Sequence, residues 1–349
     1  MTASNLETAI VGSTARPAKQ RDPWFDNARA ILIALVIVGH LVEEMSQRSA
    51  DALYTWIYAF HMPAFVLVSG YLSKSFTASP RQSRALVATL LVPYVVFRAI
   101  HELERYWVTG SYSLKLFVPS FALWFLLALA VWRLLTPVLK VLRYPALFAV
   151  VLFVLAPFDQ SLGSTFSLGR VFGLLPYFVV GLVLEHRHLR LLSGTVVRWA
   201  GAVVLAAGFA VAWVVAPVVR RGDLYLRGSY HSLSEGWISG PAHHLVVLIG
   251  GLVGSAAILA ITPRGSHWFA VVGRNSLTVY LLQAALIFPL KLNGTLHGDW
   301  DWYVTAAAVV AGFTGAALLG SPWVERATRW LVRPPTGWLF AREKAPQPV

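Results

Sequence analysis

A row of ionisable side chains follows one face of the first apolar segment, RDPWFDNARAILIALVIVGHLVEEM. Arg29 and His40 are eleven positions apart, which is close to a whole number of turns at 3.6 residues per turn. Asp26 lies one turn before Arg29, and Glu43 and Glu44 lie one turn after His40. Ionisable groups in an apolar helix are costly in lipid, so they usually face a bundle interior, a cavity or a reaction site. This stripe is therefore the first candidate for chemistry.

Proton transfer is the chemistry that the stripe best fits. Burial favours the neutral imidazole of His40, which can then accept a proton, and a neighbouring carboxylate can hold its tautomer and stabilise the imidazolium. We expect His40 to act as a base with Glu43 or Glu44 as its partner, a choice that the spacing leaves open. A structural histidine hydrogen-bonded to a neighbouring helix is the alternative, and the presence of Arg29 on the same stripe disfavours it.

Two further groups are expected on the following spans. With Arg29 at the cytoplasmic boundary, a rise of about 1.5 Å per residue places His40 about 16 Å further in, near the bilayer middle. The second span runs back, and the same rise places His61 about 14 Å from the outer face, level with His40. We expect His61 to position or support the base. Arg98 falls toward the outer leaflet, and either Arg98 or Arg29 would stabilise a developing oxyanion.

A pair of arginines opens the third span. Arg81 and Arg84 are one turn apart in KSFTASPRQSRALVATLL, at the expected cytoplasmic start of a helix. The helix dipole, unpaired amides and two guanidinium forks would together form an anion site suited to phosphate. The alternative is that both residues only anchor the span on the cytoplasmic side.

Composition places these segments in a membrane. Mean hydropathy is +0.62, with 57% hydrophobic and 13% charged residues, which lies outside the range of soluble domains. We predict an all-α polytopic membrane protein of about ten transmembrane helices, multi-pass in the cell membrane. Stretches of spanning length lie at 29–46, 52–72, 84–101, 114–135, 144–157, 169–184, 196–218, 242–261, 275–290 and 303–320.

The charges of the loops predict the topology. With the N-terminus inside, 19 of the 29 Lys and Arg residues fall in inner segments and 8 in outer ones, as the positive-inside rule requires. Both termini are then cytoplasmic, with tails at 1–28 and 321–349 around a transmembrane domain at 29–320. The charge is dispersed, which argues against a nucleic-acid partner. The absence of cysteine excludes disulfides and a cysteinyl acyl-enzyme.

The longest polar interruption is the outer segment 220–241. Tyr225, Tyr230 and Trp237 offer stacking faces, and His231 and Glu235 offer hydrogen-bonding groups, as a carbohydrate platform would need. An interfacial aromatic belt explains them equally well. The chain has no P-loop, no GxSxG, no HExxH and no dinucleotide fingerprint. We therefore expect no metal and no permanently bound cofactor.

Several short motifs point to one family. They are DN-x-R at 26–29, the spacing of Arg29 and His40, FHMPAFVLVSG at 60–70, R-x-x-R at 81–84 followed by LVPY, LWFL at 123–126 and SLTVYLLQ at 276–283. Over essentially its whole length the chain resembles the membrane acyltransferase 3 superfamily, and within it the fucose 4-O-acetylase-like acetyltransferases. The resemblance implies a ten-helix enzyme that moves an acyl group from cytoplasmic acyl-CoA to a hydroxyl, often outside.

The resemblance also implies roles for the matched residues. The motif of Arg29 and His40 would be required for activity, and that of Arg81 and Arg84 would handle the donor. The final motif often ends in His where this chain has Gln283, so no catalytic role is assigned to that position. Five residues are assigned to acceptor binding or support, namely Asp26, His61, Arg98, Trp124 and Tyr280.

We therefore expect an O-acyltransferase, most simply an O-acetyltransferase, with acetyl-CoA or another acyl-CoA as donor substrate. The acceptor would be a hydroxyl of a sugar, glycan or glycosylated small molecule, the bilayer is a further partner, and a homo-oligomer is left open. One continuous cavity should join a basic mouth at Arg81 and Arg84 to an opening beneath 220–241, lined by Arg29, His40, His61 and Arg98. The rival is a secondary transporter, in which the buried charges would form a proton relay.

Overall fold

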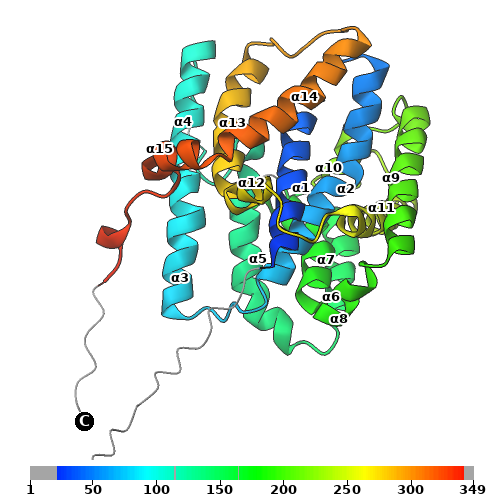
Figure 1. The fold of residues 1–349 in the computed structure, drawn as a ribbon, viewed down its shortest axis with the longest axis horizontal. Helices are drawn as coiled ribbons and strands as arrows, with labels where there is room; N and C mark the ends of the chain where they lie inside the picture. Colours follow the sequence, from blue (N-terminus) through cyan, green and yellow to red (C-terminus); the bar gives the residue numbers. More distant parts are fainter. Residues whose placement is uncertain (1–21, 114, 164, 342–349) are drawn as a thin grey trace, which may run out of the picture.

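The structure, a computed structural model, describes residues 22–113, 115–163 and 165–341 (Figure 1). Within these residues the chain forms helices and no strand, and one isolated β-bridge joins Met45 and Gly298. Most of the predicted N-terminal tail and the last eight residues lie outside the described part. So do five of the charges used to predict the topology, those of Arg16, Lys19, Arg21, Arg342 and Lys344.

The first half of the chain contributes α1 (Pro23–Val42), α2 (Arg48–Leu72), α3 (Pro80–Leu86), the π-helical η1 (Val87–Leu91), α4 (Val92–Thr109), the short 3-10 turn η2 (Phe121–Leu123), α5 (Trp124–Val141), α6 (Pro145–Leu155) and η3 (Ala156–Phe158). The second half contributes η4 (Thr165–Ser167), α7 (Leu168–Val183), α8 (His186–Leu191), α9 (Thr195–Val215), α10 (Arg221–Tyr225), α11 (Ser239–Ile261), α12 (Ala270–Arg274), α13 (Ser276–Leu292), α14 (Trp302–Leu319), α15 (Pro322–Val332) and η5 (Gly337–Leu339).

Each of the ten predicted stretches overlaps one of these helices. In the described residues, eight helical segments are long and apolar enough to cross a membrane: Pro23–Val42, Arg48–Leu72, Pro80–Thr109, Phe121–Val141, Thr165–Val183, Thr195–Val215, Ser239–Ile261 and Trp302–Leu319. Two further apolar helices, Pro145–Phe158 and Ser276–Leu292, are shorter. The predicted fold class, an all-α polytopic membrane protein, is confirmed.

The first helix begins earlier than predicted, and this changes the place of His40. Asp22 accepts a hydrogen bond from the Trp24 backbone N–H, and Pro23 at the first helical position has no N–H to satisfy. Because α1 runs from Pro23 to Val42, His40 lies in its last turn. His40 therefore lies farther along α1 than was assumed for the depth estimate, which started the helix at Arg29.

The helix α1 forms the centre of the bundle and packs against α2, α12, α13 and α14 (Figure 1). The helices α2 and α7 approach each other closely, because each places a glycine against the backbone of the other. A Cβ on Gly70 would lie 2.0 Å from the Phe178 carbonyl oxygen, and one on Gly181 would lie 1.9 Å from that of Leu67. Small residues allow such close helix packing in membrane proteins, and this contact fixes two walls of the site described below.

The third span contains an irregular turn. The five π-helical residues Val87–Leu91 join α3 to α4, and Pro93 follows them directly. Proline has no N–H for the helical ladder, and its ring would clash with the carbonyl of the residue four positions earlier, here Thr89. The wider π turn accommodates Pro93 without breaking the helix.

Candidate active site

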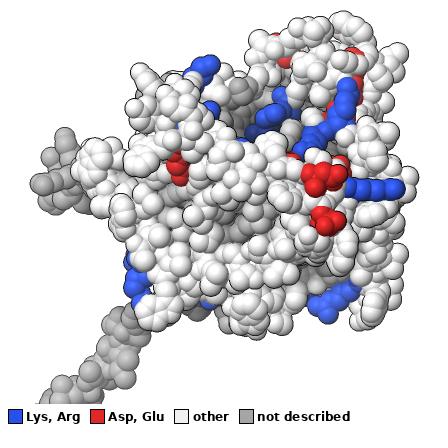
Figure 2. Space-filling model, turned by 90° about the horizontal axis from the view of Figure 1, so that it is seen from above, with Lys and Arg blue, Asp and Glu red and all other residues white. Residues whose placement is uncertain are grey.

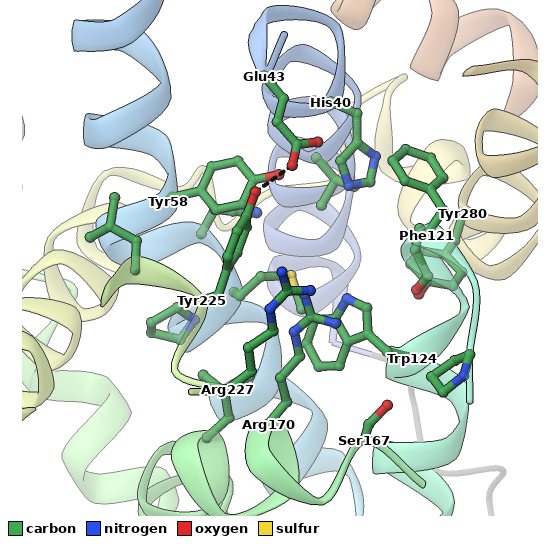
Figure 3. A pocket seen from close by; sticks show the side chains of 18 of the residues that line it. His40, Glu43, Tyr58, Phe121, Trp124, Ser167, Arg170, Tyr225, Arg227 and Tyr280 are labelled. Atoms are coloured by element: carbon green, nitrogen blue, oxygen red, sulfur yellow. Dashed lines mark hydrogen bonds between the residues drawn. The ribbon is translucent and has the colours of Figure 1, made fainter. Parts of the chain in front are cut away.

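A cavity of about 300 Å³ lies between the end of α1, the middle of α2, the start of α7 and α13, and α10 also lines it (Figure 3). Five residues predicted from the sequence share it: His40, Glu43, His61, Trp124 and Tyr280. The structure adds others that the sequence analysis did not assign to the site, namely Tyr58, Phe121, Ser167, Arg170, Tyr225, Arg227 and Lys291.

His40 is held by a neutral partner. Its Nδ1 lies 3.0 Å from Oε1 of Gln283, on α13. The Gln283 amide is oriented by its own nitrogen, which donates to the Tyr280 carbonyl oxygen at 3.1 Å. Because Oε1 can only accept, His40 Nδ1–H is the donor, and the lone pair of Nε2 remains for the cavity. The Phe121 ring packs against the imidazole, with ring centroids 4.5 Å apart.

Neither predicted glutamate partner is hydrogen-bonded to His40. Glu43 lines the cavity and accepts from the Tyr225 hydroxyl and, at 2.6 Å, from Lys291 Nζ. Glu44 points to Lys291 at 2.8 Å and to His297 at 3.0 Å. In the structure, Gln283 therefore occupies the orienting position that the sequence analysis gave to a carboxylate. Sequence spacing could not show this, because 243 positions separate the two residues.

Glu43 is ionised in its surroundings. Burial opposes ionisation, but the Lys291 ammonium and the neighbouring His40 outweigh it and hold the pKa of the Glu43 carboxyl below its usual value. Burial and the Glu43 carboxylate raise the pKa of the Tyr225 phenol, so Tyr225 stays protonated and donates. Glu43 thus places one negative charge in the same cavity as His40.

His61 lies on the opposite wall. Its Nδ1 donates to the Ile57 carbonyl oxygen at 2.7 Å, one turn earlier in α2, and the side chain is only 2% exposed. The Tyr58 ring meets the imidazole edge-on, with centroids 4.7 Å apart. These contacts fix His61 in one orientation, so in the structure it forms a rigid part of the cavity wall.

Two arginines form the basic side of the cavity. The Arg170 guanidinium stacks on the Trp124 ring at 4.6 Å, and the Arg227 guanidinium stacks on the Tyr225 ring at 4.7 Å. Figure 3 shows the two guanidinium groups side by side, below His40 and Glu43. Figure 2, a view from above, shows Lys and Arg side chains gathered in a recess of that face. The sequence analysis missed this pair because Arg170 and Arg227 come from separate segments.

Arg29 does not reach His40. It forms an ion pair with Asp26 one turn earlier and lines a second cavity of about 180 Å³, together with Arg133. Tyr280 lines both cavities, and its hydroxyl donates to the Ala122 carbonyl oxygen. The single continuous cavity predicted from the sequence is thus replaced by two cavities that meet at Tyr280.

Arg98 lies outside both cavities. It forms a buried ion pair with Glu102, and its Nη2 donates to the Ser113 carbonyl oxygen at 2.9 Å. Its guanidinium is thus used to hold the end of α4 to the following loop. The expectation that Arg98 shares a cavity with His40 is wrong.

Arg81 and Arg84 also lie away from His40, and neither lines either cavity. Ser79 and Gln82 form a capping box that satisfies amides at the start of α3, so fewer donors are open to an anion than the sequence analysis assumed. The Arg84 guanidinium donates to the Ala341 carbonyl oxygen at 3.0 Å and lies over the Phe340 ring.

A cluster with the spacing of metal ligands lies outside the cavity. Carboxylate and imidazole atoms of Asp223, Glu235 and His243 lie within 4.8 Å of one another. Arg220 already pairs with both carboxylates, each at 3.3 Å, and His243 lies 2.6 Å from Glu235. This ion-pair network holds the segment 220–241 in place over the site.

Comparison with known proteins identifies the family. A family model described as an acyltransferase domain matches residues 22–321. The chain belongs to the acyltransferase 3 family. It is 25% identical over 363 residues to the nodulation protein NolL of Sinorhizobium fredii (strain NBRC 101917 / NGR234), covering 92% of this chain and 91% of that protein. Over 124 residues, 32% of this chain and 30% of the relative, it is 36% identical to NolL of Mesorhizobium japonicum. No solved structure matches the chain.

Membership of the family confirms the resemblance found in the sequence and makes the chain a membrane acyltransferase. The matched region contains His40, Gln283 and all the other residues of the cavity described above. The rival reading as a secondary transporter receives no support from these matches.

Proposed function

We propose that this acyltransferase moves an acyl group, most simply acetyl, from acyl-CoA to a hydroxyl of a sugar, glycan or glycosylated small molecule. The observation that supports the proposal is the orientation of His40. Gln283 Oε1 accepts a hydrogen bond from His40 Nδ1–H, which leaves Nε2 as the only ring nitrogen able to accept a proton in the cavity. A base must lie within hydrogen-bond reach of the hydroxyl it deprotonates, and the cavity offers that space beside His40.

The reaction follows from these positions. The acceptor hydroxyl gives its proton to His40 Nε2 as its oxygen attacks the thioester carbonyl carbon. The C–S bond then breaks, and the CoA thiolate leaves and takes the proton back from the imidazolium. Gln283 holds Nδ1–H throughout, and the Glu43 carboxylate supplies a negative charge that favours the imidazolium while it exists.

The donor would arrive from the second cavity. Arg29 and Arg133 give it a basic lining, and Arg29 lies near the start of α1, the end that the charge pattern predicts to be cytoplasmic. Tyr280 borders both cavities, so movement of this side chain would let the thioester reach His40. Arg81 and Arg84 remain candidates for contact with the CoA phosphates at the surface.

The test is acyl transfer by purified protein in lipid nanodiscs, with acetyl-CoA and a panel of sugar acceptors. Release of CoA can be followed with a thiol reagent without background, because the chain has no cysteine. His40→Ala should lower turnover by about 100-fold or more, the usual contribution of a general base. The exposed His186 on α8 provides a matched control, and His186→Ala should keep full activity. Equal turnover of both variants would remove His40 from the mechanism.

A further inference from the structure

Within the part of the chain that the structure describes, the basic side of the His40 cavity has no anionic partner. Neither Arg170 nor Arg227 makes an ion pair or a side-chain hydrogen bond with any residue that the structure describes. Among the described residues, Glu43 is the one carboxylate lining the cavity, and it is already bound by Lys291 and Tyr225. The guanidinium of Arg170, which is partly buried, and that of the more exposed Arg227 therefore line the cavity without an ion-pair partner among these residues. An unpaired cation in a partly buried position such as that of Arg170 is costly unless a ligand supplies the negative charge.

Ser167 is a second, independent sign of a ligand. Its side chain lines the same cavity, is only 4% exposed, and its hydroxyl has no hydrogen-bond partner among the described residues. Ser167 precedes the first residue of α7 but does not cap the helix with its side chain, and its φ of 57° is left-handed. Buried polar groups are nearly always paired, so an unpaired hydroxyl in a cavity points to a missing partner.

The two arginines are oriented to bind an oxyanion. The Arg170 guanidinium lies between two rings, 4.6 Å from the centre of the Trp124 ring and 5.6 Å from that of the Tyr225 ring. The Arg227 guanidinium lies 4.7 Å from the centre of the same Tyr225 ring. Stacking on their faces leaves the N–H edges of the guanidinium groups for hydrogen bonds, the geometry that suits carboxylate and phosphate. The positive end of the α7 dipole adds to the same field.

We propose that the acceptor is anionic, and that its carboxylate or phosphate group is bound by Arg170, Arg227 and Ser167 while its hydroxyl faces His40. The proposal rests on the proposed acyl transfer and narrows its acceptor class. The CoA phosphates are a poor alternative occupant. The donor enters past Tyr280 from the other cavity, and its pantetheine arm keeps the phosphates on that side of the thioester.

Matched neutral and acidic sugars test the proposal at the level of binding. Glucose, glucuronate and glucose 6-phosphate should be titrated by calorimetry into the protein in nanodiscs, without donor. An acidic sugar should bind at least about tenfold more tightly than glucose, because each charge-assisted hydrogen bond contributes more than a factor of ten. The two acids distinguish a carboxylate from a phosphate ligand. Equal affinity for all three sugars would overturn the proposal.

Variants connect that preference to the site. Arg170→Gln with Arg227→Gln should remove the acidic preference, so that the two acidic sugars bind no more tightly than glucose, and Ser167→Ala should weaken acid binding by a smaller factor. Arg143→Ala removes a positive charge from an exposed position on the loop before α6 and should change nothing. An acidic preference that survives the double variant would place the anion elsewhere and overturn the assignment.

Turnover separates this inference from the proposed function. If Arg170→Gln lowers the turnover of glucose and of the acidic sugars by the same factor, Arg170 stabilises the reacting oxyanion and the acceptor assignment fails, although acyl transfer by His40 stands. The double variant could lose acid binding while the protein transfers no acyl group from acetyl-CoA to any hydroxyl. That result would support the anion site and contradict the proposed reaction.

Discussion

At the scale of single residues, the most specific arrangement is the chain of contacts from Tyr280 through Gln283 to His40. The carbonyl of Tyr280 fixes the amide of Gln283, and the amide fixes the tautomer of His40. A neutral orienting partner is unusual for a base, because a carboxylate would also stabilise the imidazolium. In this site the negative charge comes instead from Glu43, which is bound to a different set of residues.

Gln283→Leu should therefore lower kcat roughly 10- to 100-fold, the range found when the orienting partner of a metal-bound histidine is removed. Gln283→Glu, in contrast, should retain activity. It should also move the acidic limb of the kcat–pH profile to higher pH, because a carboxylate favours the imidazolium. If Gln283 had only a structural role, the acidic limb of the kcat–pH profile would not move. Thermal unfolding of each variant checks that the bundle is intact, and unchanged kcat in Gln283→Leu would contradict the assignment.

The residue types and spacing of the first two spans predicted part of this group. His40, Glu43 and His61 lie in one cavity, because helical periodicity is local and can be read along the chain, whereas Arg29, expected in the same cavity, lines the other one. The partners from distant segments could not be predicted in the same way. Arg170 and Arg227 follow no common period, and their pairing depends on how α7 and the segment after α10 meet in space.

At the scale of elements, the site depends on the close approach of α2 and α7. His61 lies on α2 and Arg170 on α7, so any change in the spacing of these helices changes the width of the cavity. The apolar runs in the sequence were enough to predict the helices themselves. They did not predict where the helices end, because the ends depend on the Asp22 cap at the start of α1 and on the π turn before Pro93.

Gly181→Ala should push α2 and α7 apart, because its Cβ would lie 1.9 Å from the Leu67 carbonyl oxygen, and backbone cannot yield as a side chain can. We expect a loss of roughly 1–3 kcal/mol in stability, typical of overpacking, together with reduced acyl transfer. Gly250→Ala on α11 is the control, since a Cβ there meets nothing within 4 Å. Thermal unfolding should separate the two variants. An equal or higher melting temperature for Gly181→Ala would show that the interface is looser than its geometry indicates.

At the scale of the whole molecule, the two cavities and the charge pattern give the proposed transfer a direction. The cavity with Arg29 lies toward the start of α1, and the cavity with His40 lies at its end, beneath the segment 220–241. Since acyl-CoA is cytoplasmic, the start of α1 should face the cytoplasm, as the 19 to 8 division of loop charges predicts. Composition was enough to predict a membrane bundle, but the meeting of the two cavities depends on side-chain packing around Tyr280 and could not be predicted from the sequence.

Single cysteines can test this orientation directly, because the chain has none of its own. Ser75→Cys lies in the connection before α3 and His231→Cys in the segment 220–241, and both positions are exposed. In intact cells an impermeant thiol reagent should label only His231→Cys, whereas Ser75→Cys should become labelled after the membrane is opened. The charge asymmetry favours the orientation with the His40 cavity on the outer side. The reverse labelling pattern would place this cavity on the cytoplasmic side. The donor and the acceptor would then have to enter from the same face, and Tyr280 could no longer separate two routes to the base.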